Sequence, residues 1–328
     1  MSPAEEIALT LDLDGTPSVA ILHHPAEPSG LGVVIVVGGP QTRVGPHRQF
    51  VALARRLAAA GHAVLRFDHR GIGDTSAPHP GFERIRPDIQ AAIETLRQQV
   101  PEARRLVLWG LCDSVPAICA HAAQDARIAG IVLVNPWVRD AATQDTALIR
   151  HYYLRRPLQR EFWRNLRRGH SDVTDFLRRS LRSLGHALRR KARSLLRPPA
   201  PARPASLAGR LVADLGRFDG AVRLVVSGHD ITAREFETAA AAQPGWRRIA
   251  DKPGFSRLAV ETADHTFTER ADMDQLVATT LAWLDQLADA PDRTDRPVTR
   301  PPAALADPRP EHRASAVAAP LQTKSPMS

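Results

Sequence analysis

Short apolar runs alternate with stretches of helical periodicity along the first 140 residues. The run at 33–37 is continuous and β-branched, which is typical of a strand covered on both faces. It is followed by a predicted helix at 47–60, where apolar residues share one face. The same pattern predicts strands at 63–67, 106–109 and 128–134, and helices at 89–100 and from 115 to about 121. Such alternation with short connections indicates a parallel, doubly wound sheet with helices on both faces.

The pattern also divides the chain into segments. Two weakly alternating stretches, 5–12 and 18–24, predict an N-terminal hairpin, and further strands at 221–226 and 257–260 with a helix at 273–284 continue the sheet. Between these parts the strand pattern stops and amphipathic helices are expected instead. We therefore expect a core in two parts, a helical cap insertion between them, and a disordered tail rich in Pro, Ala and Arg, with bounds 1–139, 206–288, 140–205 and 289–328.

The net charge of +9 is concentrated in the predicted cap. Residues 150–210 hold 17 arginines or lysines and three acidic residues, so the rest of the chain is slightly acidic. An Arg-rich helical face is commonly just solvated, but it could also bind an anionic membrane surface or an acidic glycan. Nucleic acid is not expected, because no recognised reading motif accompanies the charge.

Cysteine content and hydropathy indicate a cytoplasmic protein. Cys112 and Cys119 would lie about 10 Å apart on one helix, too far for a disulfide. No apolar run reaches the length of a bilayer span, and the N-terminus lacks a signal-peptide pattern. We therefore expect a soluble protein in a reducing compartment.

The chemistry is centred on the stretch 106–115. An apolar strand runs into Gly110, Cys112 and Ser114 and then into an Ala-rich helix. This is the sequence form of a nucleophile elbow, with Cys112 in the position usually held by serine and Ser114 where glycine is usual. A thiol at a helix N-terminus is favoured as the thiolate. The alternative is that Cys112 is only a small buried residue in a strand-to-helix turn.

Two later strand ends supply the partners that such a nucleophile needs. Asp230 follows the strand at 221–226, and His265 follows the strand at 257–260. Nucleophile, acid and histidine in this order match the α/β hydrolase fold, which is the fold class that we predict. His265 would accept the thiol proton, and Asp230 would orient the imidazole. Asp214 and Asp219 are weaker alternatives for the acid.

An acyl-transfer site also needs backbone donors for the oxyanion. The first would be the amide of Asp113, directly after the nucleophile. The second should come from the loop 38–41, but Pro40 has no N–H, so Gly39 or Gln41 must serve. The histidines have no metal-type spacing, and no phosphate-binding glycine loop follows the first parallel strand, so no cofactor or metal is expected.

Several longer motifs carry a specific resemblance. They are GGPQTRVGPHRQF at 38–50, WGLCD at 109–113, NPWV at 135–138, HYYL at 151–154, QREFW at 159–163 and ADHTF at 263–267. Across roughly 5–288 the chain resembles the type 1 α/β hydrolases associated with bacterial exosortase A systems. The resemblance implies a cytoplasmic hydrolase linked to exopolysaccharide and protein sorting, and within its motifs we expect Trp137, Tyr152 and Tyr153 to contact the substrate. The elbow alone also resembles that of dienelactone hydrolases.

Two functions follow from these observations. The first is an enzyme that cleaves a small-molecule ester or thioester through an acyl-thioenzyme on Cys112. The second is a non-catalytic or acyl-transferring accessory protein whose basic cap binds an anionic membrane or an acidic glycan intermediate.

Overall fold

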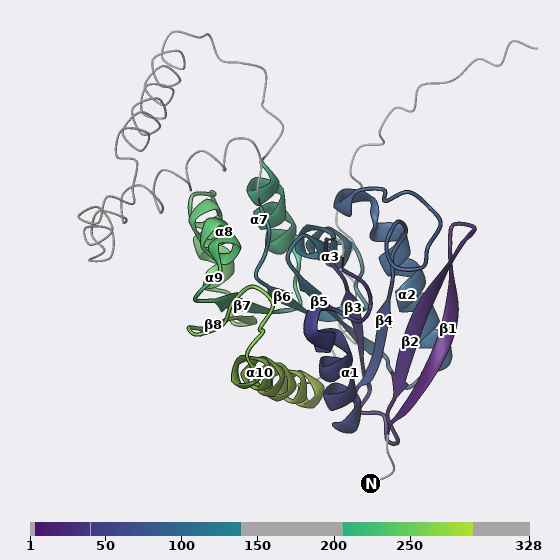
Figure 1. Cartoon of the computed structure of the whole chain (residues 1–328). Coiled ribbons are helices and arrows are strands. Elements are labelled where there is room, and N and C mark those ends of the chain that lie inside the picture. Colours follow the sequence, from purple (N-terminus) through teal and green to yellow (C-terminus); the bar gives the residue numbers. More distant parts are fainter. Residues whose placement is uncertain (1–3, 40, 139–205, 291–328) are drawn as a thin grey trace, which may run out of the picture. The chain divides into compact units, whose positions relative to one another are not determined.

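A single eight-stranded sheet forms the centre of the computed structural model, which describes residues 4–39, 41–138 and 206–290 (Figure 1). The strand order is β1-β2-β4-β3-β5-β6-β7-β8. The strands are β1 (Glu5–Leu13), β2 (Thr16–His24), β3 (Leu31–Val36), β4 (Ala63–Phe67), β5 (Arg105–Leu111), β6 (Ile128–Val134), β7 (Ala221–Ser227) and β8 (Phe255–Val260).

The sheet is mostly parallel, as the alternating pattern predicts. Strands β4, β3, β5, β6, β7 and β8 run parallel in that order. Only the N-terminal hairpin departs from this arrangement, because β1 pairs antiparallel with β2 and β2 pairs antiparallel with β4. The carboxyl ends of the six parallel strands therefore meet at one edge, where ligands bind in sheets of this kind.

Helices cover both faces of the sheet, and two separate apolar clusters result. The helices are α1 (Gln49–Ala59), α2 (Arg86–Gln99), α3 (Ser114–Ala122), α7 (Leu207–Arg217), α8 (Ile231–Ala241), α9 (Trp246–Ala250) and α10 (Arg270–Asp289), with short 3-10 turns at Pro46–Arg48 and Phe82–Arg84. In Figure 1, α1 and α10 lie on one face, and α2, α3, α7, α8 and α9 lie on the other. The six residues of β3 are all buried, because both their faces are covered.

Three helices in the second part of the core were not predicted from periodicity. They are α7, α8 and α9, between the end of the predicted cap and the last strand. The apolar residues Leu207, Leu211 and Leu215 of α7 are spaced by four, and Ser206 caps the helix by accepting a hydrogen bond from the Gly209 N–H at 3.1 Å. These signals were present in the sequence, but they adjoin the Pro-rich end of the predicted cap.

The predicted cap and tail lie almost entirely outside the described residues, so their helices, charge and disorder stay predictions. Within the described part of the chain, none of the helices combines the length and apolar character needed to cross a bilayer.

Candidate active site

The turn between β5 and α3 has the backbone of a nucleophile elbow. Cys112 has a φ of 65°, in the left-handed region that non-glycine residues rarely adopt. Gly110 is required beside it, because a Cβ at this position would collide with Ile118 Cδ1 and lie 2.5 Å from Ser114 Oγ. Ser114 is buried, and its hydroxyl donates to the Leu111 carbonyl at 3.0 Å. Serine is thus accommodated where glycine is usual.

The elbow is fastened to the end of the neighbouring strand β6. The Cys112 N–H donates to the Val134 carbonyl at 3.0 Å, and the Cys112 carbonyl accepts from the Trp137 N–H at 3.2 Å. The side chain of Cys112 is partly exposed, whereas Cys119 is fully buried within α3. Burial raises the pKa of the Cys119 thiol far above its usual range, so only Cys112 is placed for chemistry.

His265 and Asp230 come together as their positions after β8 and β7 predict. His265 Nδ1 lies 2.8 Å from Asp230 Oδ2, and the imidazole is about one-third exposed, whereas the carboxyl is buried. The hydrogen bond with Asp230, followed by one with Cys112, raises the pKa of His265 to about 10. Asp230 thus holds the imidazole of His265, and Cys112 is the second side chain that acts on the same ring.

Asp230 has a second structural role, because it is also the N-cap of α8. Its side-chain oxygens accept hydrogen bonds from the Thr232 N–H at 3.0 Å and the Ala233 N–H at 3.2 Å. These two backbone donors fix the carboxylate, and the fixed carboxylate in turn orients the imidazole. Neither Asp214 nor Asp219, the weaker alternatives from the sequence, is needed to explain the partner of His265.

Asn135 positions the histidine loop, a role that the sequence did not reveal. It is fully buried at the end of β6 with a φ of 44°. Its Nδ2 donates to Ser227 Oγ at 2.9 Å and to the His265 carbonyl at 3.0 Å, and its Oδ1 accepts from the Ser227 N–H at 2.8 Å. Its position at a strand end was the available signal, but no local pattern indicates partners 92 and 130 residues away.

The loop after β3 is anchored by a buried carboxylate. Asp68, at the end of β4, accepts from the Arg43 N–H at 2.6 Å and pairs with the Arg43 guanidinium, which also lies 3.0 Å from Asp74. These contacts give Asp68 a structural role at the end of β4. They hold the loop that carries the predicted second oxyanion donor.

The predicted oxyanion donors lie at the elbow, but their N–H groups already have partners. The Gly39 N–H donates to Asp113 Oδ1 at 2.5 Å, and the Gln41 N–H donates to the Gly38 carbonyl at 3.3 Å. Burial raises the pKa of the Asp113 carboxyl, while hydrogen bonds from the N–H groups of Gly39 and of Asp113 itself act in the opposite direction. Asp113 thus contributes a side chain to the place where only its amide was expected.

The predicted substrate contacts fall into two groups. Trp137 lies next to the elbow and packs edge-on against Phe82, with ring centroids 5.3 Å apart. Tyr152 and Tyr153 lie outside the described residues. Among the residues that are described, no group of three or more His, Cys, Asp or Glu side chains is arranged to hold a metal ion.

Sequence comparisons match a family model and a curated relative. The family model described as serine aminopeptidase, S33, matches residues 31–189. The quorum-quenching protein AidA of Acinetobacter baumannii (strain MDR-ZJ06) is 26% identical over 145 residues, which are 41% of this chain and 45% of that protein. The chain thus matches less than half the length of this relative.

Solved structures share the whole fold at low sequence identity. The Pyrococcus furiosus esterase Pf2001 is 12% identical with a TM-score of 0.57, covering 86% of this chain and 91% of its own. The α/β hydrolase GrgF from Penicillium sp. sh18 is 15% identical with a TM-score of 0.55, covering 88% and 99%. Est1E of Butyrivibrio proteoclasticus, solved with ferulic acid, is 13% identical with a TM-score of 0.55, covering 85% and 98%.

Proposed function

We propose that this chain, which has the α/β hydrolase fold, hydrolyses a carboxylic ester or thioester with Cys112 as the nucleophile. The observation that carries the proposal is the relay in which Asp230 holds His265 Nδ1 and His265 also interacts with Cys112. The relay stands at the carboxyl ends of parallel strands, on a left-handed elbow. The name of Pf2001, an esterase with this fold, is consistent with it.

In the proposed reaction the Cys112 sulfur attacks the acyl carbonyl carbon, and the thiol proton passes to His265. The tetrahedral intermediate collapses as the bond to the leaving group breaks, and His265 returns the proton to the departing alcohol or thiol. Water, deprotonated by His265, then attacks the acyl-thioenzyme. The carboxylic acid leaves and the Cys112 thiol is restored, so one ester bond and one water are consumed.

The substrate setting rests on the sequence resemblance. The exosortase-associated hydrolases imply an acyl ester of the exopolysaccharide pathway, handled in the cytoplasm. Both cysteines are free thiols, which suits a reducing compartment. Small carbohydrate O-acyl esters are therefore the first substrates to examine.

A second function is favoured by one specific observation. The N–H groups of Gly39 and Gln41 are both bonded within the chain, so neither stands open to an oxyanion. An accessory protein or acyltransferase would need less hydrolytic power, with the basic segment at 140–205 binding an anionic membrane or an acidic glycan intermediate. Flotation with anionic liposomes at low and high salt tests this membrane role, which requires salt-sensitive binding.

The hydrolase proposal is tested by detecting the covalent acyl-enzyme. Wild type, Cys112→Ala and the matched control Cys119→Ala are assayed with p-nitrophenyl esters and acyl-CoAs, and the acylated protein is trapped and mapped by mass spectrometry. We expect hydrolysis and an acyl group on Cys112 in the wild type and in Cys119→Ala, and neither in Cys112→Ala. Turnover that persists in Cys112→Ala would contradict the proposed nucleophile.

A further inference from the structure

Asp113 stands at the N-cap position of α3 but does not cap the helix. An aspartate at this position ordinarily accepts from the N–H groups two or three residues ahead. Here the side chain makes no such bond. It points across the site instead, where Oδ1 accepts from the Gly39 N–H at 2.5 Å. The carboxylate therefore bonds to an N–H group 74 residues away and not to those of its own helix.

The loop after β3 is fitted closely around this carboxylate. A Cβ at position 38 would collide with Asp113 Oδ1 and lie 2.5 Å from the Leu111 carbonyl, so only glycine allows the approach. The N–H groups of Gly39 and of Asp113 itself both act to lower the pKa of this carboxyl. The side chain thus occupies the Gly39 N–H, one of the N–H groups predicted to form the oxyanion hole.

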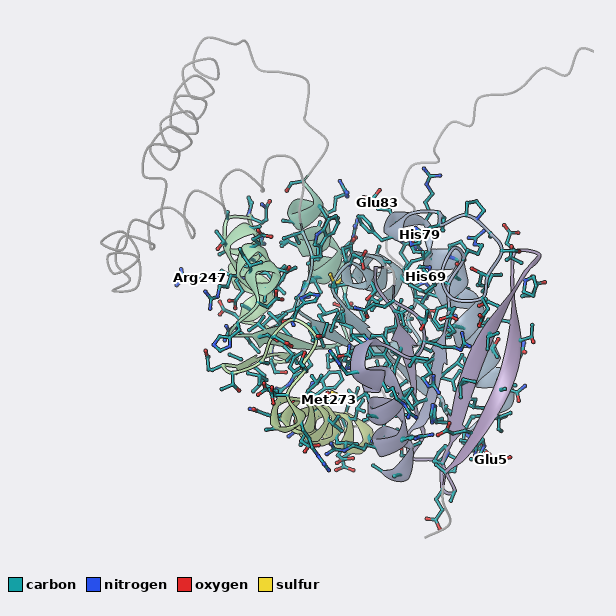
Figure 2. All side chains as sticks on the ribbon, viewed as in Figure 1. Glu5, His69, His79, Glu83, Arg247 and Met273 are labelled. Carbon is teal, nitrogen blue, oxygen red and sulfur yellow. The ribbon has the colours of Figure 1, made fainter. Side chains whose placement is uncertain are left out.

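Two histidines lie near Asp113 and act to lower the pKa of its carboxyl. His69 and His79 lie close enough to influence its charge, and their rings pack edge-on with centroids 5.1 Å apart (Figure 2). Burial lowers the pKa of His69, so this ring is neutral near pH 7. Among the described residues no arginine or lysine forms an ion pair with Asp113. Its negative charge is held mainly by backbone N–H groups.

An oxyanion and this carboxylate require the same donor. As the thiolate attacks, negative charge develops on the carbonyl oxygen and must be met by preorganised N–H groups. A carboxylate already on one of those groups blocks the site and repels the developing charge. We propose that Asp113 is an internal occupant of the oxyanion hole at the Gly39 N–H, which a substrate must displace before it can react. This inference rests on the proposed acyl chemistry at Cys112.

Two variants test the occupant. Asp113→Ala removes the side chain that accepts from the Gly39 N–H, whereas Asp113→Asn keeps an acceptor oxygen without the charge. We expect kcat/KM for p-nitrophenyl acetate to rise about 10- to 100-fold in Asp113→Ala, the size expected from releasing one charge-assisted hydrogen bond. The kcat/KM of Asp113→Asn should lie between that of the wild type and that of Asp113→Ala. The Ki of a trifluoromethyl ketone, which forms a tetrahedral adduct on Cys112, should fall by a similar factor.

Iodoacetamide labelling of Cys112 separates this inference from the proposed function, because alkylation needs no oxyanion hole. We expect rapid labelling of Cys112 in the wild type and in both variants. Suppose that labelling is rapid but Asp113→Ala lowers kcat/KM and raises the Ki of the ketone. Asp113 then only positions the loop, and the inference is overturned. If Asp113→Ala fails to fold, an Asp113→Asn variant no more active than the wild type overturns it. Slow labelling of Cys112 in the wild type would instead remove the nucleophile, and the inference with it.

Discussion

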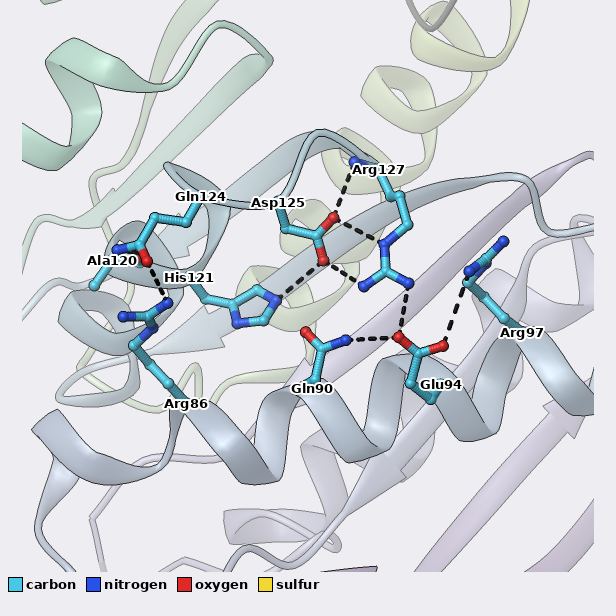
Figure 3. Close-up of polar contacts among 9 residues, drawn as sticks. All are labelled: Arg86, Gln90, Glu94, Arg97, Ala120, His121, Gln124, Asp125 and Arg127. Carbon is cyan, nitrogen blue, oxygen red and sulfur yellow. Dashed lines mark hydrogen bonds and ion pairs between the residues drawn. The ribbon is translucent and has the colours of Figure 1, made fainter. Parts of the chain in front are cut away.

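Two of the histidine–aspartate pairs among the described residues lie at opposite ends of the parallel strands. His265 and Asp230 follow the carboxyl ends of β8 and β7. His121 and Asp125 lie at the end of α3, just before β6 begins, and His121 Nε2 is 3.4 Å from Asp125 Oδ2 (Figure 3). Proximity of the two residue types is therefore insufficient to define a site.

The two aspartates differ in what else they bind. Asp125 accepts three hydrogen bonds from Arg127, at 2.7–3.0 Å from its backbone N–H and its guanidinium. Although burial acts to raise it, these bonds hold the pKa of the Asp125 carboxyl well below its usual range. Among the described residues, the Asp230 side chain accepts hydrogen bonds only from backbone N–H groups and the imidazole. A carboxylate without a competing cation can stabilise an imidazolium, and that is the property acyl transfer requires.

The two imidazoles also differ in exposure. The His121 side chain is 5% exposed, whereas that of His265 is 31% exposed and interacts with a thiol. The same pair of residue types thus packs a helix end in one place, and in the proposed mechanism it activates a nucleophile in the other. The following experiments test whether this contrast is functional.

The largest difference is expected between His265→Gln and His121→Gln. Loss of His265 removes the proton acceptor, so kcat/KM for ester hydrolysis should fall about 10³-fold or more. His121 lies away from the elbow, and its variant should keep nearly full activity. The comparison uses steady-state rates on folded protein, checked by circular dichroism. Equal losses in both variants would remove the functional distinction between the pairs.

The next largest difference in activity is expected between Asp230→Asn and Asp125→Asn. Asparagine at 230 still caps α8 but no longer fixes the tautomer of His265, so kcat should fall on the order of 10²- to 10⁴-fold. Because the cap is kept, the free energy of unfolding should change by less than about 1 kcal/mol. Asp125→Asn should retain its rate. Urea denaturation and kinetics on the same samples separate the two effects, and a normal rate in Asp230→Asn would exclude it as the acid.

The pH dependence of stability distinguishes the wild type from His265→Gln. The pKa of His265 is raised to about 10, above its ordinary value, so its charged form stabilises the folded chain. That contribution is complete below about pH 6.5 and is lost as the pH rises through 10. At pH 6 we expect the free energy of unfolding of the wild type to exceed that of His265→Gln by on the order of 1 kcal/mol, after allowance for solvent screening. This difference should vanish above about pH 10. A difference independent of pH would contradict the ion-pair account.

The smallest expected effect is on the free energy of unfolding and concerns Asp125 alone. Because its pKa is lowered, Asp125 stabilises the fold above about pH 4, and this contribution is lost as the pH falls further. Asp125→Asn should therefore cost roughly 1 kcal/mol of unfolding free energy at pH 7. The cost should shrink in acid. Thermal melts of the wild type and the variant across pH measure it, and a constant shift would point to packing instead.

The sequence predicted those features that depend on local pattern and chain order. The buried run at 33–37 predicted a central strand, and residues placed after successive strands predicted the meeting of Cys112, Asp230 and His265. Parallel strands deliver their carboxyl ends to one edge, so chain order alone brought the three together.

The features that were not predicted depend on contacts between distant segments. The hydrogen bonds of Asn135 to Ser227 and to the His265 carbonyl have no local signature. Nor does the contact of Asp113 with Gly39, because an aspartate after an elbow would ordinarily be assigned to helix capping. These contacts arise from the closeness of loops that the sheet brings together, which periodicity does not encode.

The left-handed backbone at Cys112 implies an evolutionary trade-off. A side chain in this conformation costs roughly 1–2 kcal/mol that glycine would not incur. A mutation to glycine would thus relax the corner while removing the sulfur, and selection for robustness alone would drift toward an inert protein. Under the proposed function, selection for turnover offsets this cost, so loss of the reaction should be followed by replacement of Cys112.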